Sequence, residues 1–276
     1  MCRKQNTLNN KITFIGVGIH SGCRAEMVVK PASVDHGIVF KSAGELIEAS
    51  YKNVVSTKRS TVLGKNGIQV STVEHFMAAL WACEIDNALI EIDGPEVPIL
   101  DGSALPFCQE LKKVGVVSQD KVATESFCLQ EPIFVSEGES LILARPASKL
   151  ILESDVTYKS PQVGHQIFSF CGTGEEFCTA VAPARTFGFW AEVKDLLANN
   201  LGKGGNLDNA LIFDRPGFNP QSILRYDNEP VRHKMLDLAG DLNLLGVPVK
   251  AHILAIRAGH KLHVEFVRKV AEVINR

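Results

Sequence analysis

The sequence has no surplus of charge in either sign. Lys and Arg together number 29 against 31 Asp and Glu, which gives a formal net charge of -2 at pH 7. A protein that binds nucleic acid through the phosphate backbone needs a basic surface that releases counterions. The charge balance therefore argues against general nucleic-acid binding, and we expect no nucleic-acid partner.

Long apolar runs are also missing. No stretch of the chain approaches the roughly 20 apolar residues that a helix needs to cross a bilayer. The opening MCRKQNTLNNKITF lacks the apolar segment of a secretory signal peptide. We therefore expect no membrane span, and we do not expect Cys2 to be a lipoprotein cysteine.

Paired cysteines are the third absence. The seven cysteines are odd in number and scattered, and none stands in CxxC spacing. This usage is typical of free thiols in a reducing compartment. We therefore expect a cytoplasmic protein.

The length of the chain favours more than one domain. At about 150 residues per domain, the 276 residues make roughly two domains, and a hydrophobic content of 45% suits folded globular structure. The polar segment 118–126 interrupts the apolar pattern. It predicts a boundary between a first domain over 1–120 and a second domain over 127–276.

Both halves mix short strands with a few helices. Segments rich in β-branched residues and bounded by turn formers predict strands over 11–20, 25–32, 37–42, 88–94, 127–138, 140–147, 149–158, 165–171 and 252–259. Apolar residues recur at helical spacing over 71–84, 103–114, 189–199, 230–245 and 261–275. The mixture predicts an α+β fold rather than a doubly wound parallel sheet.

In two of these helices, both faces avoid bulky charged side chains. In 71–84, large apolar side chains form one face, and His75 with several alanines forms the other. The helix 230–245 places His233 opposite its leucine stripe, and in both halves an apolar strand follows the His-bearing helix. This echo predicts an internal duplication that brings the two helices face to face.

The first candidate for chemistry is a pair on the later helix. His233 and Asp237 are four residues apart, so their side chains point the same way and could share one metal ion. Eight His and 31 acidic residues give this spacing about once by chance in a chain of this length. From spacing alone, a solvated or capping pair is an equal alternative.

The second candidate lies at the start of the earlier helix. Ser71 and Glu74 have the spacing of a capping box, which is a purely structural alternative. However, His75 would be buried without a polar partner, which is costly. A metal shared with His233 and Asp237 would supply that partner and leave a fourth tetrahedral position for water, as in catalytic zinc sites. Glu74 could then take a proton from that water.

The third candidate is His260, which opens the last helix. Asp241 lies one turn beyond Asp237 and could hold His260 in its protonated form, raising its pKa. A simple surface histidine is the alternative, and we expect a surface role for His263. Lys234 projects toward the wall of any cleft beside the helix, although such a lysine is usually solvated.

Two loop-like segments could form the wall of a substrate site. Arg185, Thr186 and Phe187 lie in one of them, and residues 201–209 form the other, which is rich in glycine and asparagine. Binding residues are often carried by loops on a rigid scaffold. Composition alone does not assign a substrate to them.

Five separate segments together resemble a known family. They are STVEHFMAAL (71–80), PILDGSALPF (98–107), ARTFGF (184–189), VRHKMLDLAGDL (231–242) and GHKLHVEF (259–266). In order and spacing they resemble the UDP-3-O-acyl-N-acetylglucosamine deacetylases, zinc-dependent amide hydrolases of lipid A and lipopolysaccharide biosynthesis, from about Asn6 to Lys269. The resemblance implies two similar α+β domains, each a mostly antiparallel sheet with helices, with the helices of both domains sandwiched between the sheets.

The resemblance also implies a metal site and a reaction. His75, His233 and Asp237 would hold one Zn²⁺ per chain, and Fe²⁺ would suit the same ligands. Glu74 would activate water for attack on the N-acetyl carbonyl, which gives the free amine and acetate.

Further catalytic roles follow from the same resemblance. His260, kept charged by Asp241, would stabilise the oxyanion and could protonate the amine. Thr186 would also help the oxyanion.

Substrate recognition is implied as well. Lys234 would approach the diphosphate, and Phe187 would contact the sugar or nucleotide. The acyl chain would pass through an insertion near 188–214, lined by Leu196, Leu197, Leu201, Leu207, Leu211 and Ile212, with Gly202, Gly204 and Gly205 allowing close backbone approach. The expected partner is this small-molecule substrate alone, and the expected state is a monomer.

Two other functions fit part of the pattern. A zinc amidohydrolase acting on a different amide would keep the catalytic residues and change the insertion. The second is a protein that binds the nucleotide sugar without turnover. Such a protein would not need its catalytic residues, yet all three candidate metal ligands and both candidate acid–base residues are present in this sequence, which argues against it.

Overall fold

The computed structural model describes residues 3–217 and 219–275, so the expectation for Cys2 lies outside the described residues. Its helices are α1 (Glu74–Ala82), α2 (Leu105–Val114), α3 (Gly174–Ala180), α4 (Trp190–Ala198), α5 (Glu229–Asn243) and α6 (His260–Ile274). Its strands are β1 (Lys4–Leu8), β2 (Ile12–Val17), β3 (Arg24–Pro31), β4 (Ile38–Ser42), β5 (Glu45–Glu48), β6 (Val54–Ser56), β7 (Val62–Lys65), β8 (Ile68–Val70), β9 (Ala88–Asp93), β10 (Val116–Val122), β11 (Phe127–Cys128), β12 (Ile133–Glu137), β13 (Ser140–Pro146), β14 (Ile151–Thr157), β15 (His165–Phe170), β16 (Phe187–Phe189), β17 (Leu211–Phe213) and β18 (Val249–Ile256).

The two larger sheets repeat one topology. The first has the order β2-β3-β9-β4-β5, and the second has the path β12-β13-β18-β14-β15, with β11 pairing beside β18. In each path the central strand, β9 or β18, is antiparallel to one neighbour and parallel to the other, and both outer pairs are antiparallel. A helix precedes and another follows each central strand. The common topology supports the predicted duplication.

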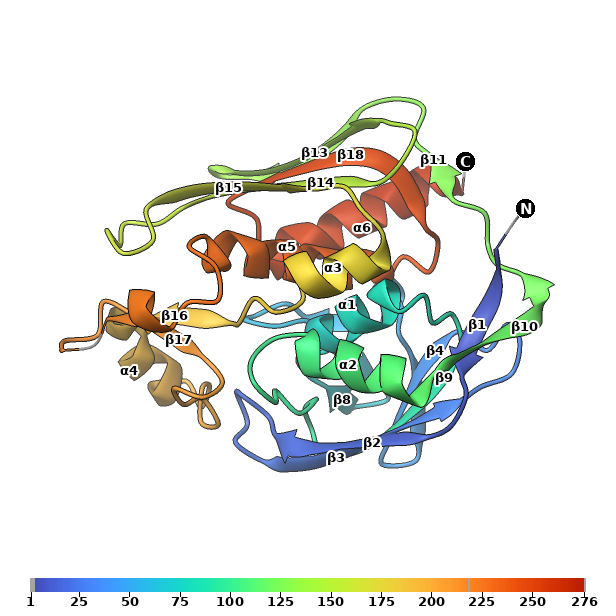
Figure 1. Cartoon of the computed structure of the whole chain (residues 1–276), viewed down its shortest axis with the longest axis horizontal. Helices are drawn as coiled ribbons and strands as arrows, with labels where there is room; N and C mark the ends of the chain where they lie inside the picture. Colours follow the sequence, from blue (N-terminus) through green and yellow to red (C-terminus); the bar gives the residue numbers. More distant parts are fainter. Residues whose placement is uncertain (1–2, 218, 276) are drawn as a thin grey trace.

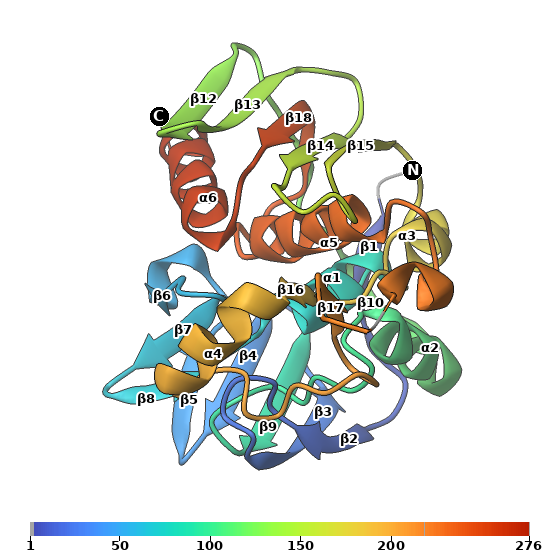
Figure 2. The same cartoon turned by 90° about the vertical axis from the view of Figure 1, so that its left-hand side faces the viewer.

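The helices lie between the two sheets. Figure 1 shows β13, β18, β14 and β15 on one side, α5, α6, α3, α1 and α2 in the middle, and β2 and β3 on the other side. Figure 2 shows the same layers after a quarter turn. Strands such as β18 bury alternate residues, so one face of the sheet packs on the helices. The α+β prediction, with helices sandwiched between mostly antiparallel sheets, is confirmed.

The two central helices, α1 and α5, come into near backbone contact. Every residue of α1 except Trp81 is buried. On α5, a Cβ atom added to Gly240 would lie 2.0 Å from the carbonyl oxygen of Glu74. Any residue other than glycine would therefore clash with α1 at this position. The prediction that two His-bearing helices face each other is confirmed, and glycine sets how closely they approach.

Some sequence expectations differ from the structure. The polar segment 118–126 is not all linker, because its first part belongs to β10, which pairs with β1. Helix α3 and the small sheet β6-β7-β8 were not expected from the pattern. The domain limits 1–120 and 127–276 stay a prediction.

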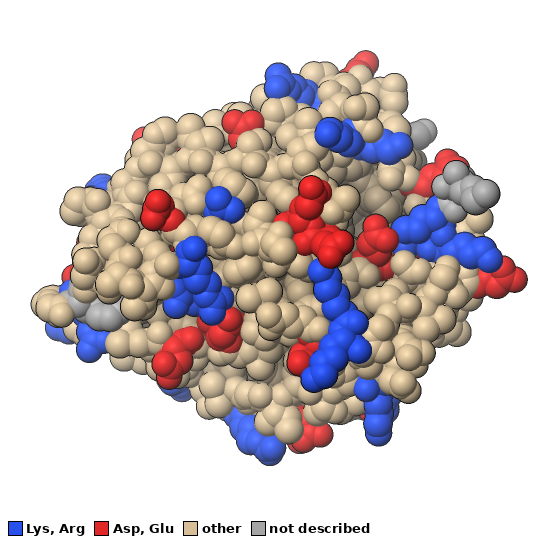
Figure 3. All heavy atoms as spheres, viewed as in Figure 1, with Lys and Arg blue, Asp and Glu red and all other residues tan. Residues whose placement is uncertain are grey.

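The surface agrees with the balanced composition. On the face in Figure 3, Lys and Arg are interspersed with Asp and Glu, without a continuous area of one sign. Among the described residues, no helix is both long enough and apolar enough to cross a bilayer.

Candidate active site

The start of α1 is held by a strained turn. Thr72 has φ +58°, a left-handed conformation that is unusual for a β-branched residue. Its hydroxyl donates to the buried carboxylate of Glu96 at 2.7 Å, which fixes the turn. The capping box, which was the structural alternative for Ser71 and Glu74, does not form: the helix begins at Glu74 and has no side-chain cap. Ser71 instead bonds through its backbone to the segment around Glu96, so Glu74 is free to face the interior.

Helix α5 supplies the facing side chains. It begins with Glu229 and Pro230, a residue suited to the first turn because its missing N–H needs no partner. His233 and Asp237 follow on one face, as their spacing predicts. Asp237 Oδ1 lies 3.4 Å from His233 Nε2 and 3.6 Å from His75 Nε2.

These three side chains fit a metal ion. All are buried, and their ligand atoms lie within 4.8 Å of one another. Among the described residues, Asp237 Oδ1 has no hydrogen-bond partner, which is costly for a buried carboxylate oxygen. The Nδ1 atom of His233 lies 3.0 Å from the Ala184 carbonyl oxygen and can donate to it, which leaves the Nε2 lone pair free for a ligand bond.

The protonation states of these side chains also suit a metal ion. Burial, reinforced by the neighbouring His233, lowers the pKa of His75 to about 3, so the ring is neutral. Burial alone raises the pKa of Asp237, but the interactions with Lys234, His233 and His260 outweigh it and hold the pKa below its usual range. Burial also lowers the pKa of His233, so that ring is neutral as well. Neutral imidazoles and an ionised carboxylate are the forms that bind divalent metals.

Lys234 is not a solvated surface lysine. Its Nζ donates to Asp237 Oδ2 at 2.7 Å and lies 5.7 Å from the ring centroid of Phe187. Burial lowers the pKa of Lys234, yet the charge of Asp237 outweighs this effect and leaves the pKa above its ordinary value. The side chain therefore places a positive charge beside the metal-binding cluster.

Glu74 is a buried carboxylate beside this cluster. One oxygen accepts the Thr61 backbone N–H at 3.0 Å, and the other lies 3.6 Å from His260 Nε2. Burial raises the pKa of Glu74 to about 8, against the opposing charge of His260. A carboxylate that is held in place and poorly solvated is suited to exchange a proton.

His260 is held by Asp241, as expected, and a second histidine joins them. Asp241 Oδ2 lies 2.9 Å from His260 Nδ1 and 2.8 Å from His263 Nδ1, while Oδ1 accepts the Thr61 hydroxyl. Burial lowers the pKa of His260, but Asp241 and Glu74 outweigh it and raise the pKa to about 9. The expected surface role of His263 is wrong, because the side chain is buried against the same carboxylate.

The loop before β16 and the first residue of that strand bring two predicted residues to the cavity, and the loop holds a third away from it. Thr186 and Phe187 line the cavity, and the Thr186 backbone N–H donates to the Gly102 carbonyl at 2.7 Å. Arg185 is not a wall residue: it is buried, and its Nε donates to Glu229 at 2.9 Å. That ion pair fixes the loop that also presents Ala184 to His233.

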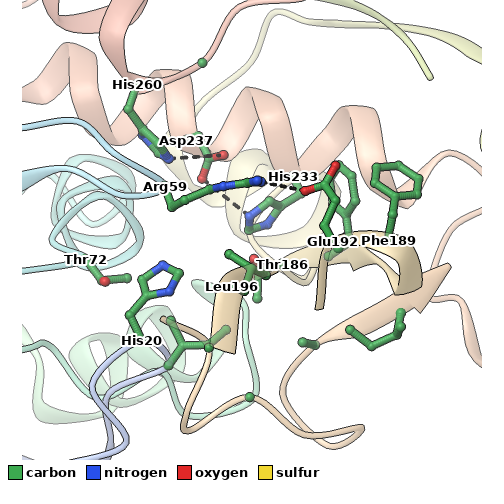
Figure 4. Close-up of a pocket in the computed structure, with 18 of the residues that line it drawn as sticks. His20, Arg59, Thr72, Thr186, Phe189, Glu192, Leu196, His233, Asp237 and His260 are labelled. Atoms are coloured by element: carbon green, nitrogen blue, oxygen red, sulfur yellow. Dashed lines mark hydrogen bonds and ion pairs between the residues drawn. The ribbon is translucent and has the colours of Figure 1, made fainter. Parts of the chain in front are cut away.

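A single cavity of about 570 Å³ connects these groups. Figure 4 shows His233, Asp237 and His260 at one side, with Thr186, Leu196 and Phe189 nearby. The predicted residues that line the cavity are Glu74, His75, Thr186, Phe187, Leu196, Leu197, Gly202, Gly205, Leu207, Ile212, His233, Lys234, Asp237 and His260. The cavity thus has a polar end at α1 and α5 and an apolar branch along α4.

Several expected residues lie elsewhere. Leu201 is not among the lining residues, and Leu211 packs against Phe213 in a separate small cluster. Gly204 does allow a close approach, but to the Gly18 carbonyl oxygen, 2.2 Å from where a Cβ would stand, rather than to the cavity. Asp241 lies behind His260, fully buried.

Sequence reasoning missed residues that come from distant loops. Ile19 and Ile99, from the first half, pack with Ala210 and Ile212 in the apolar branch. His20, Tyr158 and Arg59 also line the cavity, and an Arg59–Glu192 ion pair of 2.8 Å joins the loop before β7 to α4 (Figure 4). The positive φ of Arg59 has no sequence signal. His20 falls at the end of the predicted strand 11–20, but β2 ends at Val17, and His20 lies in the turn that follows.

Comparison with known proteins gives one consistent answer. The family model described as UDP-3-O-acyl N-acetylglycosamine deacetylase matches residues 5–272. A UDP-3-O-acyl-N-acetylglucosamine deacetylase of Syntrophotalea carbinolica is 43% identical over 96% of this chain and 87% of its own length. The proteins of that name from Thermosynechococcus vestitus and a Nostoc species are 43% and 41% identical, covering 97% and 99% of this chain and 94% and 100% of their own lengths.

Proposed function

The chain belongs to the UDP-3-O-acyl N-acetylglycosamine deacetylase family and hydrolyses the N-acetyl group of UDP-3-O-acyl-N-acetylglucosamine in lipid A biosynthesis, and we propose that it does so with one zinc ion held by His75, His233 and Asp237. The single observation that carries the proposal is the convergence of two histidine side chains, His75 and His233, on the unpartnered Oδ1 of Asp237. Fe²⁺ suits the same ligands. When bound, the ion would supply a Lewis acid for the amide carbonyl and would lower the pKa of a water molecule.

Glu74 acts as the general base in this proposal. The attacking water forms a bond from its oxygen to the acetamide carbon, and its proton passes to the Glu74 carboxylate. The Thr61 N–H holds one oxygen of that carboxylate at 3.0 Å, which leaves the other to face the cavity. General base catalysis of this kind contributes about 10² to 10⁴ in rate.

His260 and Thr186 serve the later part of the reaction. The protonated ring of His260, supported by Asp241 at 2.9 Å, stabilises the negative oxygen that develops on the acetamide carbon. The Thr186 hydroxyl assists it from the loop before β16. When the C–N bond breaks, His260 or Glu74 gives a proton to the amine, and acetate leaves.

The two ends of the cavity suit the two ends of the substrate. Lys234, beside Phe187, offers a positive charge for the diphosphate and an aromatic ring for the sugar or nucleotide. Leu196, Leu197 and Leu207 line the apolar branch, which suits a long acyl chain, and Gly205 adds no side chain there. A different amide without an acyl chain would have no use for this branch.

The compartment, the partners and the oligomeric state of the enzyme are also part of the proposal. The six cysteines that the structure describes are free thiols, which supports the cytoplasm as the compartment. The balanced charge supports a small-molecule substrate without a nucleic-acid partner. We propose that the working unit is a monomer.

Removal and replacement of the metal tests the proposal. Purified protein should contain about one zinc per chain, and chelation should abolish deacetylation of the UDP-linked acylated N-acetylglucosamine. Added Zn²⁺ should restore it, with Fe²⁺ tested in parallel under anaerobic conditions. Full activity in protein free of metal would contradict the proposed chemistry.

A further inference from the structure

Three cysteines from three helices meet away from the active site. Cys83 follows the last residue of α1, Cys108 lies within α2, and Cys178 lies within α3. All three are buried, and their sulfur atoms lie within 4.8 Å of one another. Figure 1 shows these helices side by side in the middle layer, and Figure 2 shows α2 and α3 together at one edge of it.

The cluster is distinct from the catalytic centre. At a rise of about 1.5 Å per residue, Cys83 lies about 12 Å along the helix axis from His75. None of the three thiols lines the catalytic cavity. The catalytic cluster offers nitrogen and oxygen atoms, whereas this one offers only sulfur, so the two would select different metal ions.

The spacing of the sulfur atoms suits one ion at their centre. Three thiolates around an ion at about 2.3 Å, the length of a zinc–sulfur bond, stand about 4.0 Å from one another. The observed limit of 4.8 Å needs only a small inward movement of three side chains. A disulfide needs two sulfur atoms at about 2.05 Å and leaves the third unused.

The surroundings favour one thiolate among the three cysteines. Hydrogen bonds with Cys178 and Cys83, together with burial, raise the pKa of Cys108. The hydrogen bond with Cys108 lowers the pKa of Cys83, but Cys178 and burial outweigh it and raise that pKa. Hydrogen bonds from Cys108 and Cys83, with the nearby ammonium of Lys112, hold the pKa of Cys178 well below its usual range. Lys112 stands one helical turn after Cys108 and is exposed, so it adds a positive charge at the edge of the cluster. Cys83 and Cys178 keep 9% and 4% of their surface exposed, which gives an ion a route to the sulfur atoms.

We propose that Cys83, Cys108 and Cys178 form a second metal site, which binds one soft monovalent d¹⁰ cation, Cu(I), through three thiolates. Structural zinc takes four ligands, and the cluster offers three, whereas Cu(I) is satisfied by three thiolates. The ion displaces the protons of two thiols to solvent and joins the existing thiolate, with no change in oxidation state. Lys112 offsets part of the remaining negative charge.

The test is a copper competition under anaerobic, reducing conditions. Zinc-loaded full-length protein is titrated into the coloured Cu(I) complex of bathocuproine disulfonate, and the loss of colour reports copper transfer. Wild-type protein is expected to remove one copper per chain. Cys178→Ser and Cys108→Ser are expected to bind Cu(I) at least tenfold more weakly, with circular dichroism and thermal unfolding used to check that they fold.

Two control variants distinguish copper binding at this cluster from binding at the other cysteines or at the proposed zinc site. A variant in which the remaining cysteines, Cys2, Cys23, Cys128 and Cys171, are replaced by Ser should still remove one copper. His233→Ala, which alters only the proposed zinc site, should do so as well, so failure of one site is distinguishable from failure of the other.

Copper X-ray absorption on the wild-type complex should show three sulfur neighbours, which keeps the proposal testable if the Ser variants unfold. Equal uptake by folded Cys178→Ser, no uptake by wild-type protein, or a first shell without three sulfurs would overturn the proposal.

Discussion

The two repeats of this molecule share a topology and differ in what they do with it. In the path of each sheet, the second and third strands along the chain flank a central strand that comes last, and each repeat puts a helix, α1 or α5, against the other repeat. The shorter α1 brings Glu74 and His75 in its first turn. The longer α5 brings His233, Asp237 and Asp241 along one face over two turns.

The insertions differ more than the scaffolds. Between β5 and α1, the first repeat carries the small sheet β6-β7-β8, and Thr61, in the connection between β6 and β7, bonds to Glu74 and Asp241. At the equivalent place, between β15 and α5, the second repeat carries α3, β16, α4 and β17, which supply Thr186 and the apolar branch. A symmetric scaffold thus carries an asymmetric site, in which each repeat lacks what the other provides.

Loss of a ligand from the second repeat should have the largest effect. In His233→Ala the metal content should fall from about one per chain to near zero, and activity should fall by more than the 10- to 100-fold typical of lost outer-shell partners. Elemental analysis and a deacetylation assay at equal protein concentration measure both. Full zinc retention would mean that the ligand set is wrong.

Loss of the base from the first repeat should leave the metal in place. Glu74→Gln keeps the size and the Thr61 contact while removing the carboxylate, so kcat should fall about 10² to 10⁴-fold. Zinc content should match the wild type. Near wild-type turnover would remove Glu74 from the proton-transfer role.

A substitution in the insertion of the second repeat should have the next largest effect on activity. Thr186→Val removes one hydroxyl with little change in volume, and kcat should fall about 10² to 10³-fold, the cost of one oxyanion donor. KM should change little, because the hydroxyl acts in the transition state. An unchanged kcat would assign Thr186 a structural role.

The contact between the repeats can itself be broken. Gly240→Ala places a methyl group against the Glu74 carbonyl, and overpacking of this kind costs about 1 to 3 kcal/mol in the free energy of unfolding. Chemical denaturation measures this cost. An unchanged denaturation midpoint would mean that α1 and α5 have room to separate.

The smallest effect should lie in the apolar branch. Leu207→Ala should raise KM for the long-acyl substrate about fivefold, corresponding to about 1 kcal/mol of lost contact. Leu201→Ala should have a smaller effect, because Leu201 does not line the cavity. Equal effects of the two substitutions would contradict the lining seen in the structure.

Periodicity and motif spacing predicted most of the scaffold. The helices at 230–245 and 103–114 match α5 and α2 closely, since each has a regular apolar stripe and a Pro or Gly at its ends. Helix α3 was missed because its seven residues make fewer than two full apolar turns. The short strands β6 to β8 were missed for the same lack of repeats.

In the candidate site as well, contacts within one helix could be predicted from the sequence, whereas contacts between distant segments could not. Spacing on one helix linked His233 to Asp237, but only folding reveals that Thr61 touches Glu74 and Asp241, 13 and 180 residues away. His263 was misplaced because its partner, Asp241, lies on another helix. Leu201 has the same composition signal as Leu207, and loop geometry alone separates them.

The most direct test of the central claim is zinc X-ray absorption on protein loaded with one zinc per chain. The account predicts a first shell of nitrogen and oxygen at about 2.0 to 2.1 Å, with outer-shell scattering from two imidazoles, one from each repeat. A sulfur neighbour at about 2.3 Å, or scattering from fewer than two imidazoles, would contradict a metal centre shared by His75, His233 and Asp237.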